Sequence, residues 1–234
     1  ADEHLKAAGK PIDYQNRFIA IGNYGSIDDV FNYAQTAING TTASQVIPGD
    51  LIYIDFNGDG IINSNDKVVV DELNYPLTTI GFSFGFNWKG LNFSAMLYSP
   101  RNIYKLQFDQ YLWDFPASNI RVQPKSMERW TPETANSSGV MRPATHLNNT
   151  YNKVESTYRY SDYSYIRLKN MEIGYTFPKK IGLSEAHISN LQVYMNGNNL
   201  LTFWKGDKRV DPETGGVGSY PIVRTYTLGL RVSF

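Results

Sequence analysis

The chain has 234 residues, 14% of them aromatic, and its 22 basic and 22 acidic residues give a formal net charge of zero. This balance gives no indication of a nucleic-acid partner, and the lack of cysteine excludes a disulfide framework and a cysteine zinc site. No apolar run approaches the roughly 20 residues of a membrane-spanning helix, although membrane-spanning strands need only about 9–11 alternating residues.

The N-terminal segment, residues 1–49, has weak patterning. It begins ADEHLKAAGK, with neither an initiator methionine nor a signal peptide, as expected of a processed chain or of a piece of a longer one. The stretch SIDDVFNYAQTAI predicts a short helix with Ser26 as its N-cap.

Residues 55–66, DFNGDGIINSND, have the ligand spacing of a cation-binding loop. A calcium loop needs oxygen ligands at positions 1, 3, 5, 7, 9 and 12, with glycine at position 6. The segment fills these positions with Gly60 at the turn and, as ligands, Asp55, Asn57, Asp59, the backbone carbonyl of Ile61, Asn63 and Asp66. Aspartate at position 12 is shorter than the glutamate of an EF-hand, so Ca²⁺ and Mg²⁺ are both candidates.

The sequences that flank this loop, LIYI and KVVV, predict strands rather than helices. We therefore expect a static clamp and not an opening calcium sensor. The alternative is a surface turn in which the Asx side chains bond their own backbone.

Residues 79–88, TIGFSFGFNW, alternate strictly between large apolar and small polar side chains. One face carries Ile80, Phe82, Phe84, Phe86 and Trp88. The C-terminal segment, residues 222–234, repeats the alternation and ends on Phe234. Further strands are predicted at 93–99, 163–177 and 191–203, and a change of parity near Lys169–Asn170 predicts a β-bulge.

The predicted connections alternate between short and long, as in an outer-membrane barrel with short periplasmic turns and long outer loops. The turn at 89–92 is short, whereas 100–162 and 204–220 are long. We therefore expect an all-β chain with two regions: an extracellular loop region, 1–78, with the cation loop, and C-terminal barrel strands with outer loops, 79–234. Five strands cannot close a membrane barrel, which needs about eight, so the rest of the wall must come from elsewhere.

The motifs, in their order, carry a family resemblance. GDLIYIDFNGDGIINSNDK, GFSFGFNWKGLNFS, YSYIRLKNMEIGYTFP, LQVYMNGNNLLTF, a DPE loop and a terminal aromatic residue resemble the C-terminal part of SusC/RagA-type TonB-dependent outer-membrane transporters of Bacteroidetes. The resemblance implies a transmembrane antiparallel β-barrel of 22 strands around a plug, with this chain supplying about the last five strands.

The same resemblance implies partners and an orientation. The partners would be a SusD-like surface lipoprotein as lid, TonB acting through a plug absent from this chain, the remainder of the barrel, and outer-membrane lipid. The cargo would be oligosaccharide or peptide, as in nutrient uptake and polysaccharide utilisation. The loops would be extracellular, and the C-terminus periplasmic with Phe234 as the signal for barrel assembly.

Catalytic chemistry has no support in the sequence, so we predict that the chain is not an enzyme. The histidines, His4, His146 and His187, are scattered, and no nucleophile motif or phosphate loop occurs. Binding is better supported, because loops as long as 100–162 are usually functional or disordered. Candidate cargo or lid contacts in this loop are Tyr111, Trp113, Asp114 and Trp130, and the alternative is that these aromatic residues pack the loop itself.

Four charged residues fall on predicted strands: Arg167, Lys169, Glu172 and Arg231. A cation on a lipid-facing surface costs about 2–4 kcal/mol at the midplane, so these side chains should point into the lumen or lie near a rim. We expect them to form a polar network with the plug.

Two rival interpretations remain. One is a secreted, calcium-stabilised β-sandwich that binds carbohydrate, and the other is a barrel in which several chains each contribute a few strands. The sandwich would bury the apolar face of Ile80–Trp88 against a second sheet, whereas a barrel would expose it to lipid.

Overall fold

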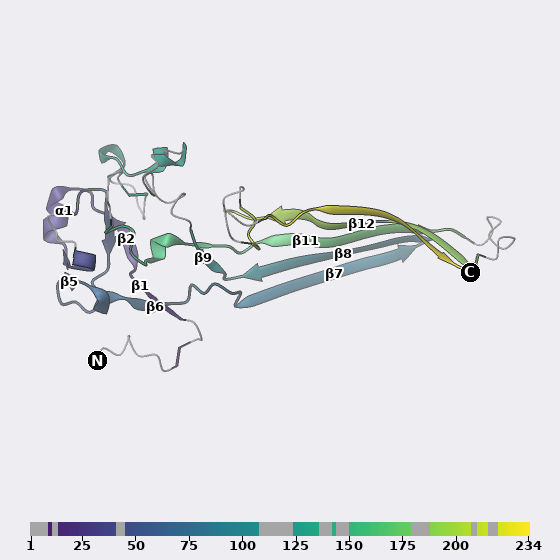
Figure 1. Cartoon of the computed structure of the whole chain (residues 1–234), viewed down its shortest axis with the longest axis horizontal. Coiled ribbons are helices and arrows are strands. Elements are labelled where there is room, and N and C mark those ends of the chain that lie inside the picture. The colour runs from purple at the N-terminus through teal and green to yellow at the C-terminus, as the bar shows by residue number, and fades with distance from the viewer. Residues whose placement is uncertain are drawn as a thin grey trace. The chain divides into compact units, whose positions relative to one another are not determined.

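The computed structural model describes residues 9–10, 14–40, 45–107, 124–135, 142–143, 150–178, 188–206, 210–214 and 220–234. Most of its regular structure is strand, and the chain divides into two compact units (Figure 1). Unit 1 comprises residues 1–73 and 105–161, and unit 2 comprises 74–104 and 162–234. In these described ranges, no helix is both long enough and apolar enough to cross a membrane.

Unit 2 is built on one five-stranded antiparallel sheet, in the order β13-β12-β11-β8-β7, whose long strands run side by side in Figure 1. The bounds are Thr78–Trp88 for β7, Leu91–Arg101 for β8, Ile166–Thr176 for β11, Asn190–Phe203 for β12 and Thr225–Ser233 for β13. All five strands lie where the alternating segments predicted them.

Two local features set the register of this sheet. Trp88 pairs with Leu91 across a two-residue turn, in which Lys89 and Gly90 both have positive φ, 48° and 91°. This is the backbone of a type I′ turn, whose twist matches that of the strands it joins. The pairing of β11 with both neighbours shifts between Leu168 and Asn170, which confirms the predicted bulge.

The register gathers the apolar residues of the five strands on one face of the sheet. Phe82 lies opposite Leu97, and Ile173 lies opposite Phe93 on β8 and Met195 on β12. Met195 in turn lies opposite Leu228 on β13. Directly opposed residues share a face in an antiparallel sheet, so the apolar surface continues across all five strands.

Unit 1 consists of short pairings around an aromatic core. Antiparallel pairs join β1 (Gln15–Arg17) to β6 (Val68–Val70) and β2 (Ala20–Asn23) to β4 (Leu51–Tyr53), and β3 (Gln35–Thr36) runs parallel to β5 (Ile61–Ile62). The flanking sequences LIYI and KVVV thus contain β4 and β6, as predicted. The core includes Phe18, Tyr53 and Tyr151, with Tyr53 5.5 Å from Phe18 and 5.2 Å from Tyr151 between ring centroids.

The helix α1 spans Ile27–Asn32, and Ser26 is its N-cap in a capping box with Asp29, as predicted. The helix is shorter than the predicted segment, because Tyr33 is already extended. The remaining strands, β9 (Tyr104–Leu106) and β10 (Tyr160–Asp162), pair with each other. Short 3₁₀ segments are η2 (Ile38–Gly40), η4 (Ser64–Asp66), η5 (Pro124–Glu128), η6 (Pro132–Thr134) and η7 (Thr157–Arg159).

A buried polar contact joins distant segments of unit 1. Asn152 donates to Asp50 Oδ1 at 2.7 Å and accepts from the backbone N–H of Leu51 at 2.8 Å. Asp50 and Asn152 are both fully buried. A buried polar group needs such partners, so this pair fixes residues 50–51 against residue 152.

Candidate functional site

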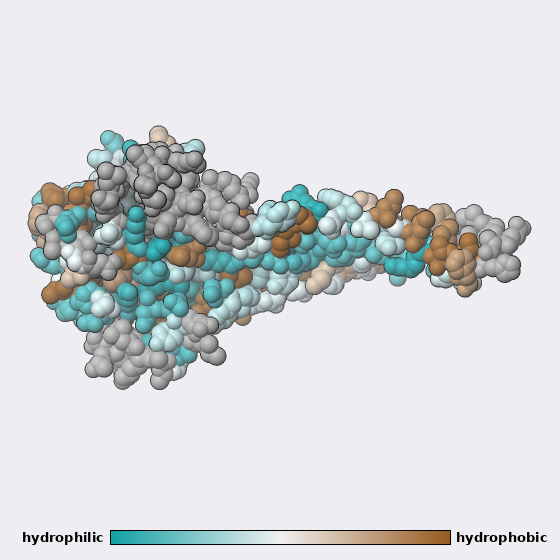
Figure 2. All heavy atoms as spheres, in the orientation of Figure 1, coloured by the Kyte–Doolittle hydropathy of each residue, from teal (hydrophilic) through white to brown (hydrophobic). Residues whose placement is uncertain are grey.

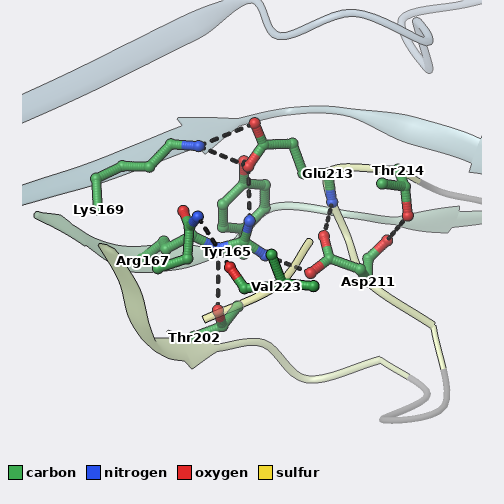
Figure 3. Close-up of polar contacts among 9 residues, drawn as sticks. Tyr165, Arg167, Lys169, Thr202, Asp211, Glu213, Thr214 and Val223 are labelled. Carbon is green, nitrogen blue, oxygen red and sulfur yellow. Dashed lines mark hydrogen bonds and ion pairs between the residues drawn. The ribbon is translucent and has the colours of Figure 1, made fainter. Parts of the chain in front are cut away.

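A cluster of charged residues occupies the polar face of the sheet in unit 2 (Figure 3). Arg167 on β11 donates to Asp211 Oδ2 through Nη2 and to Glu213 Oε2 through Nη1, each at 2.7 Å. Its Nε donates to the hydroxyl of Thr202 on β12 at 3.0 Å. The guanidinium therefore links the β12–β13 connection, which its two Nη atoms bind, to strand β12, which its Nε binds.

Glu213 is the second centre of this cluster. Its carboxylate accepts from Lys169 Nζ at 2.9 and 3.0 Å and from the hydroxyl of Tyr165 at 3.1 Å. The backbone N–H of Glu213 donates to Asp211 Oδ1, which shapes the turn at Pro212. Two cations and two carboxylates thus form one network, which we name the Arg167 clasp.

A pocket of about 440 Å³ adjoins the Arg167 clasp. Its wall includes Arg167 on β11, Trp204 and Asp211 in the β12–β13 connection, Asn199 on β12, and Arg224 directly before β13. Asn199 lies at the bulged part of β12 with φ of 54°, and its Nδ2 donates to the carbonyl of Val223. The pocket therefore belongs to the same folded connection as the clasp.

The predicted cation loop is folded by hydrogen bonds from its Asx side chains. Asp55 accepts from the backbone N–H groups of Gly58 and Gly60, each at 2.8 Å, and Asp59 accepts from that of Ile61 at 2.8 Å. Gly58 and Gly60 have φ of 72° and 83°, which glycine adopts without strain.

Asp66, at position 12 of this loop, is fully buried and binds backbone. Its carboxylate accepts from the backbone N–H groups of Phe56, Asn57 and Asn63 at 2.7–3.3 Å. Asn63 accepts from Asn65, and its Nδ2 donates to the carbonyl of Ile61. Among the residues that the structure describes, no three acidic or histidine side chains form a metal-ligand group.

The other predicted site residues lie in different surroundings. Tyr111, Trp113 and Asp114 are outside the described residues. Trp130 is buried in unit 1, and its backbone N–H donates to the carbonyl of Arg142 at 2.8 Å. Phe234 is 88% exposed.

The apolar face of the sheet is largely open. Its most exposed large side chains include Val232 at 40% and Leu228 at 78%, whereas Phe93 and Leu97 near its middle are half-buried. Figure 2 shows part of this surface in brown, over the end of the sheet beside the C-terminus. Soluble monomers rarely expose so continuous an apolar area, so this face is itself a candidate interaction surface.

Sequence reasoning placed Arg167 and Lys169 on the polar face but did not identify their partners within the chain, and the expected network with a plug stays a prediction. In the structure they pair with Asp211 and Glu213 of the same chain. The one feature of the sequence that pointed to these partners was the DPE tripeptide, which places two carboxylates on a long connection. Because 44 and 46 residues separate these carboxylates from Arg167, no local spacing links them.

Comparison with known proteins gives a consistent result, although no family model matches the chain. The chain is 33% identical over 220 residues to TonB-dependent receptor P26 of Formosa agariphila, and 28% identical over 201 residues to TonB-dependent receptor P3 of the same organism. These alignments cover 84% and 80% of this chain, and 20% and 19% of the relatives. The chain thus spans about a fifth of the length of the curated relatives it matches.

Solved structures share the fold. The RagAB peptide transporter superposes with a TM-score of 0.65 at 20% identity, and the RagAB peptide importer in its open-open state with 0.62 at 21%. Each match covers 94% of this chain and 22% of the solved chain. At this identity the likeness shows the fold alone.

The receptors matched in sequence are not enzymes, which agrees with the prediction of no catalytic activity. Sequence and fold also agree with the resemblance that the motifs carry. The chain is a SusC/RagA-like segment of a TonB-dependent transporter.

Proposed function

We propose that this chain forms part of the wall and of the outer loops of a TonB-dependent nutrient importer in the bacterial outer membrane. The observation that carries the proposal is the continuous apolar face of the five-stranded sheet. Its opposite face carries the Arg167 clasp together with small polar residues, as expected of a barrel wall between lipid and lumen.

The edges of the sheet support the same proposal. Strands β7 and β13 each pair on one side only, among the strands that the structure describes. An open edge is not tolerated in the hydrocarbon region, where every backbone group must be paired. Further strands would complete the wall, which has 22 strands in all in the family that the chain resembles.

The resemblance supplies the proposed partners and cargo. The chain would work with a SusD-like surface lipoprotein as lid and with TonB acting through a plug. The matched RagAB structures are described as a peptide importer and a peptide transporter, which supports peptide cargo, while oligosaccharide is the other class that the motifs imply. Residues 1–78 and the connection after β8 would be extracellular, and Phe234 would lie at the periplasmic rim.

The rival secreted β-sandwich is less well supported. It requires a second sheet against Phe82, Phe84 and their neighbours, yet these side chains are about half exposed within unit 2. The matched relatives are TonB-dependent receptors, and the matched fold belongs to a peptide importer.

Opposite faces of β7 offer a matched test. Phe84 and Ser83 are adjacent, and their side chains alternate between the apolar and the polar face. Phe84→Arg should cost about 2–4 kcal/mol if Phe84 faces lipid near the midplane, whereas Ser83→Arg faces the lumen and should cost much less. The assay is insertion of the complete protein into the outer membrane, read from gel mobility of unboiled against boiled samples.

The expected result is loss of the unboiled, folded band for Phe84→Arg alone. Equal insertion of the two variants would contradict the membrane assignment, as would a wild-type protein that is monomeric in water without detergent.

Cargo class and lid are tested separately. Cells that express the complete protein with and without its lipoprotein partner would be given labelled peptide or labelled oligosaccharide. Uptake of one class that depends on both proteins would support the importer. Uptake independent of the chain would refute it.

We also propose that residues 55–66 bind Ca²⁺, with Mg²⁺ as the competing ion. Asp55, Asn57, Asp59, the carbonyl of Ile61 and Asn63 are oxygen donors of the hard type that both ions prefer. Successive hydrogen bonds fold residues 55–61 into one turn. Asp66 fits less well, because three backbone N–H groups already occupy its carboxylate. The cation would keep this outer loop in one shape for lid docking.

Calorimetric titration with each ion tests this site directly. Asp59→Ala should abolish binding, whereas Asp71→Ala, at another exposed position of unit 1, should leave it unchanged. Binding unaffected by Asp59→Ala, or lid affinity unchanged by a chelator, would count against the proposal.

A further inference from the structure

A second pocket, of about 510 Å³, lies in unit 1 and brings together basic residues from distant parts of the sequence. Lys67 precedes β6, whereas Lys153 and Arg159 belong to the segment that carries η7. The wall also includes one acid, Glu155. Three cations and one carboxylate therefore face the same space.

The acid is already engaged by other groups. Glu155 Oε1 accepts from Arg159 Nη1 at 3.2 Å, and Oε2 accepts from the hydroxyl of Tyr160 at 3.1 Å. Arg159 Nη1 also donates to the carbonyl of Lys153 at 3.0 Å, which holds this segment in a tight turn. The charges of Arg159 and Glu155 offset each other locally.

The positive charges of Lys67 and Lys153 are not offset in this way. Within the described part of the chain, neither forms an ion pair, and both are half-buried. Lys67 Nζ lies 5.3 Å from the ring centroid of Phe18. This cation–π contact stabilises the ammonium charge less than an ion pair would. A partly dehydrated ammonium group is stabilised by an anion within about 4–6 Å. The pocket therefore favours a negatively charged occupant.

The rest of the wall indicates what kind of anion would fit. The buried side chains of Phe18, Ile38 and Val154 form an apolar part of the wall, while Ser64 supplies a hydroxyl. Pockets that hold small organic ligands typically span about 300–1,000 Å³ and combine apolar walls with a few polar groups. This volume and lining exceed what a bare inorganic ion needs.

We propose that this pocket binds a small organic anion: a carboxylate or sulfate ester on an uncharged body of about the size of one sugar ring. Lys67 and Lys153 contact the anionic group, and the apolar wall covers one face of the body. This site lies in unit 1 and does not depend on transport, so it goes beyond the proposed function.

Calorimetric titration of the complete protein tests the proposal with four probes: glucuronate, galactose 6-sulfate, inorganic sulfate and glucose. At least one sugar anion should bind, glucose should not, and inorganic sulfate should bind more weakly. Lys67→Met and Lys153→Met should each weaken binding about tenfold or more, as expected for loss of one charge-assisted contact. Lys153→Arg keeps the charge and should retain most of the binding.

Lys89→Met is the matched control, because Lys89 also lies over an aromatic ring, that of Trp88 at 5.2 Å, but in unit 2. It should bind the probes as the wild type does, which separates this pocket from any cargo site. Near-ultraviolet circular dichroism checks that the lysine variants remain folded. The proposal is overturned if no sugar anion binds, if glucose or sulfate binds as tightly, or if the Lys67 and Lys153 variants match the Lys89 variant.

Discussion

The Arg167 clasp makes a quantitative prediction about which of its charge pairs holds the β12–β13 connection. The side chain of Arg167 is 1% exposed and that of Asp211 14% exposed, whereas Lys169 and Glu213 are 30% and 35% exposed. The two pairs have similar separations, 2.7 and 2.9 Å, so they differ mainly in their access to water.

Access to water sets the expected magnitudes. Removing one partner of a buried pair leaves an uncompensated charge and costs about 3–5 kcal/mol. An exposed pair contributes about 0.2–1 kcal/mol, because water and salt screen it. We therefore expect a coupling energy of about 3 kcal/mol between Arg167 and Asp211, and below about 1 kcal/mol between Lys169 and Glu213.

Double-mutant cycles measure both couplings. The variants are Arg167→Met, Asp211→Asn and their combination, beside Lys169→Met, Glu213→Gln and their combination. Urea unfolding of the complete protein in detergent gives the free energies. Cleavage by a protease specific for lysine and arginine reports release of the connection itself, which contains Lys205 and Arg224.

The reasoning would be refuted if the Lys169–Glu213 coupling equalled or exceeded that of Arg167–Asp211. It would also fail if Arg167→Met left protease resistance unchanged. High salt should weaken the exposed pair and leave the buried one nearly intact, which gives an independent check.

Three further predictions concern other parts of the chain. Burial raises the pKa of Tyr24, Tyr53 and Tyr151 above the ordinary value near 10, so the folded state keeps protons that the unfolded chain loses. Stability should thus be intact below pH 10 and fall above it by about 1.4 kcal/mol per pH unit for each protected tyrosine; a free energy of unfolding in urea that stays constant above pH 10 would contradict this. Gly229→Ala should destabilise the β12–β13 pairing by about 1–3 kcal/mol, because its Cβ would meet the Tyr194 ring at 2.5 Å, while Gly81→Ala, with open space, should be neutral in the same unfolding assay. At Gly90, φ is +91° and an added Cβ would lie 2.6 Å from the carbonyl oxygen of Thr176. Gly90→Ala should therefore destabilise the fold by at least about 1 kcal/mol. An unchanged denaturation midpoint would contradict this prediction.

The long strands were predictable because period-2 alternation is a local signal. Strands β7 and β13 keep their large apolar side chains on one face over nine residues or more. The parity change at Lys169–Asn170 was readable for the same reason, since Leu168 and Met171 are both large and apolar. In β12 the corresponding shift falls in NGNN, where glycine and asparagine fit either face, so alternation gives no information there.

The parts that could not be predicted depend on contacts between distant residues. Strands of two to four residues, such as β3 and β5, are too short to show a period. The partners of Arg167 lie in a connection whose path over the sheet is a tertiary property. The anion pocket likewise needs Lys67 and Lys153 side by side, 86 positions apart in the chain, and no spacing rule connects them.

The two units use apolar and polar contacts in different proportions to hold their connections, and the proposed membrane setting explains why. Unit 1 can bury aromatic residues such as Tyr53 and Tyr151, so apolar burial holds its loops together. A sheet that gives its apolar face to lipid has fewer apolar side chains left for holding a loop on the other face, where Val210 of the β12–β13 connection packs in a small cluster with Ile103 and Tyr163. A shielded guanidinium that bridges two carboxylates is a strong contact available on such a surface, provided that water has little access to it. Arg167, with 1% of its side chain exposed, meets that condition, so the clasp is what a β12–β13 connection folded over a polar wall requires.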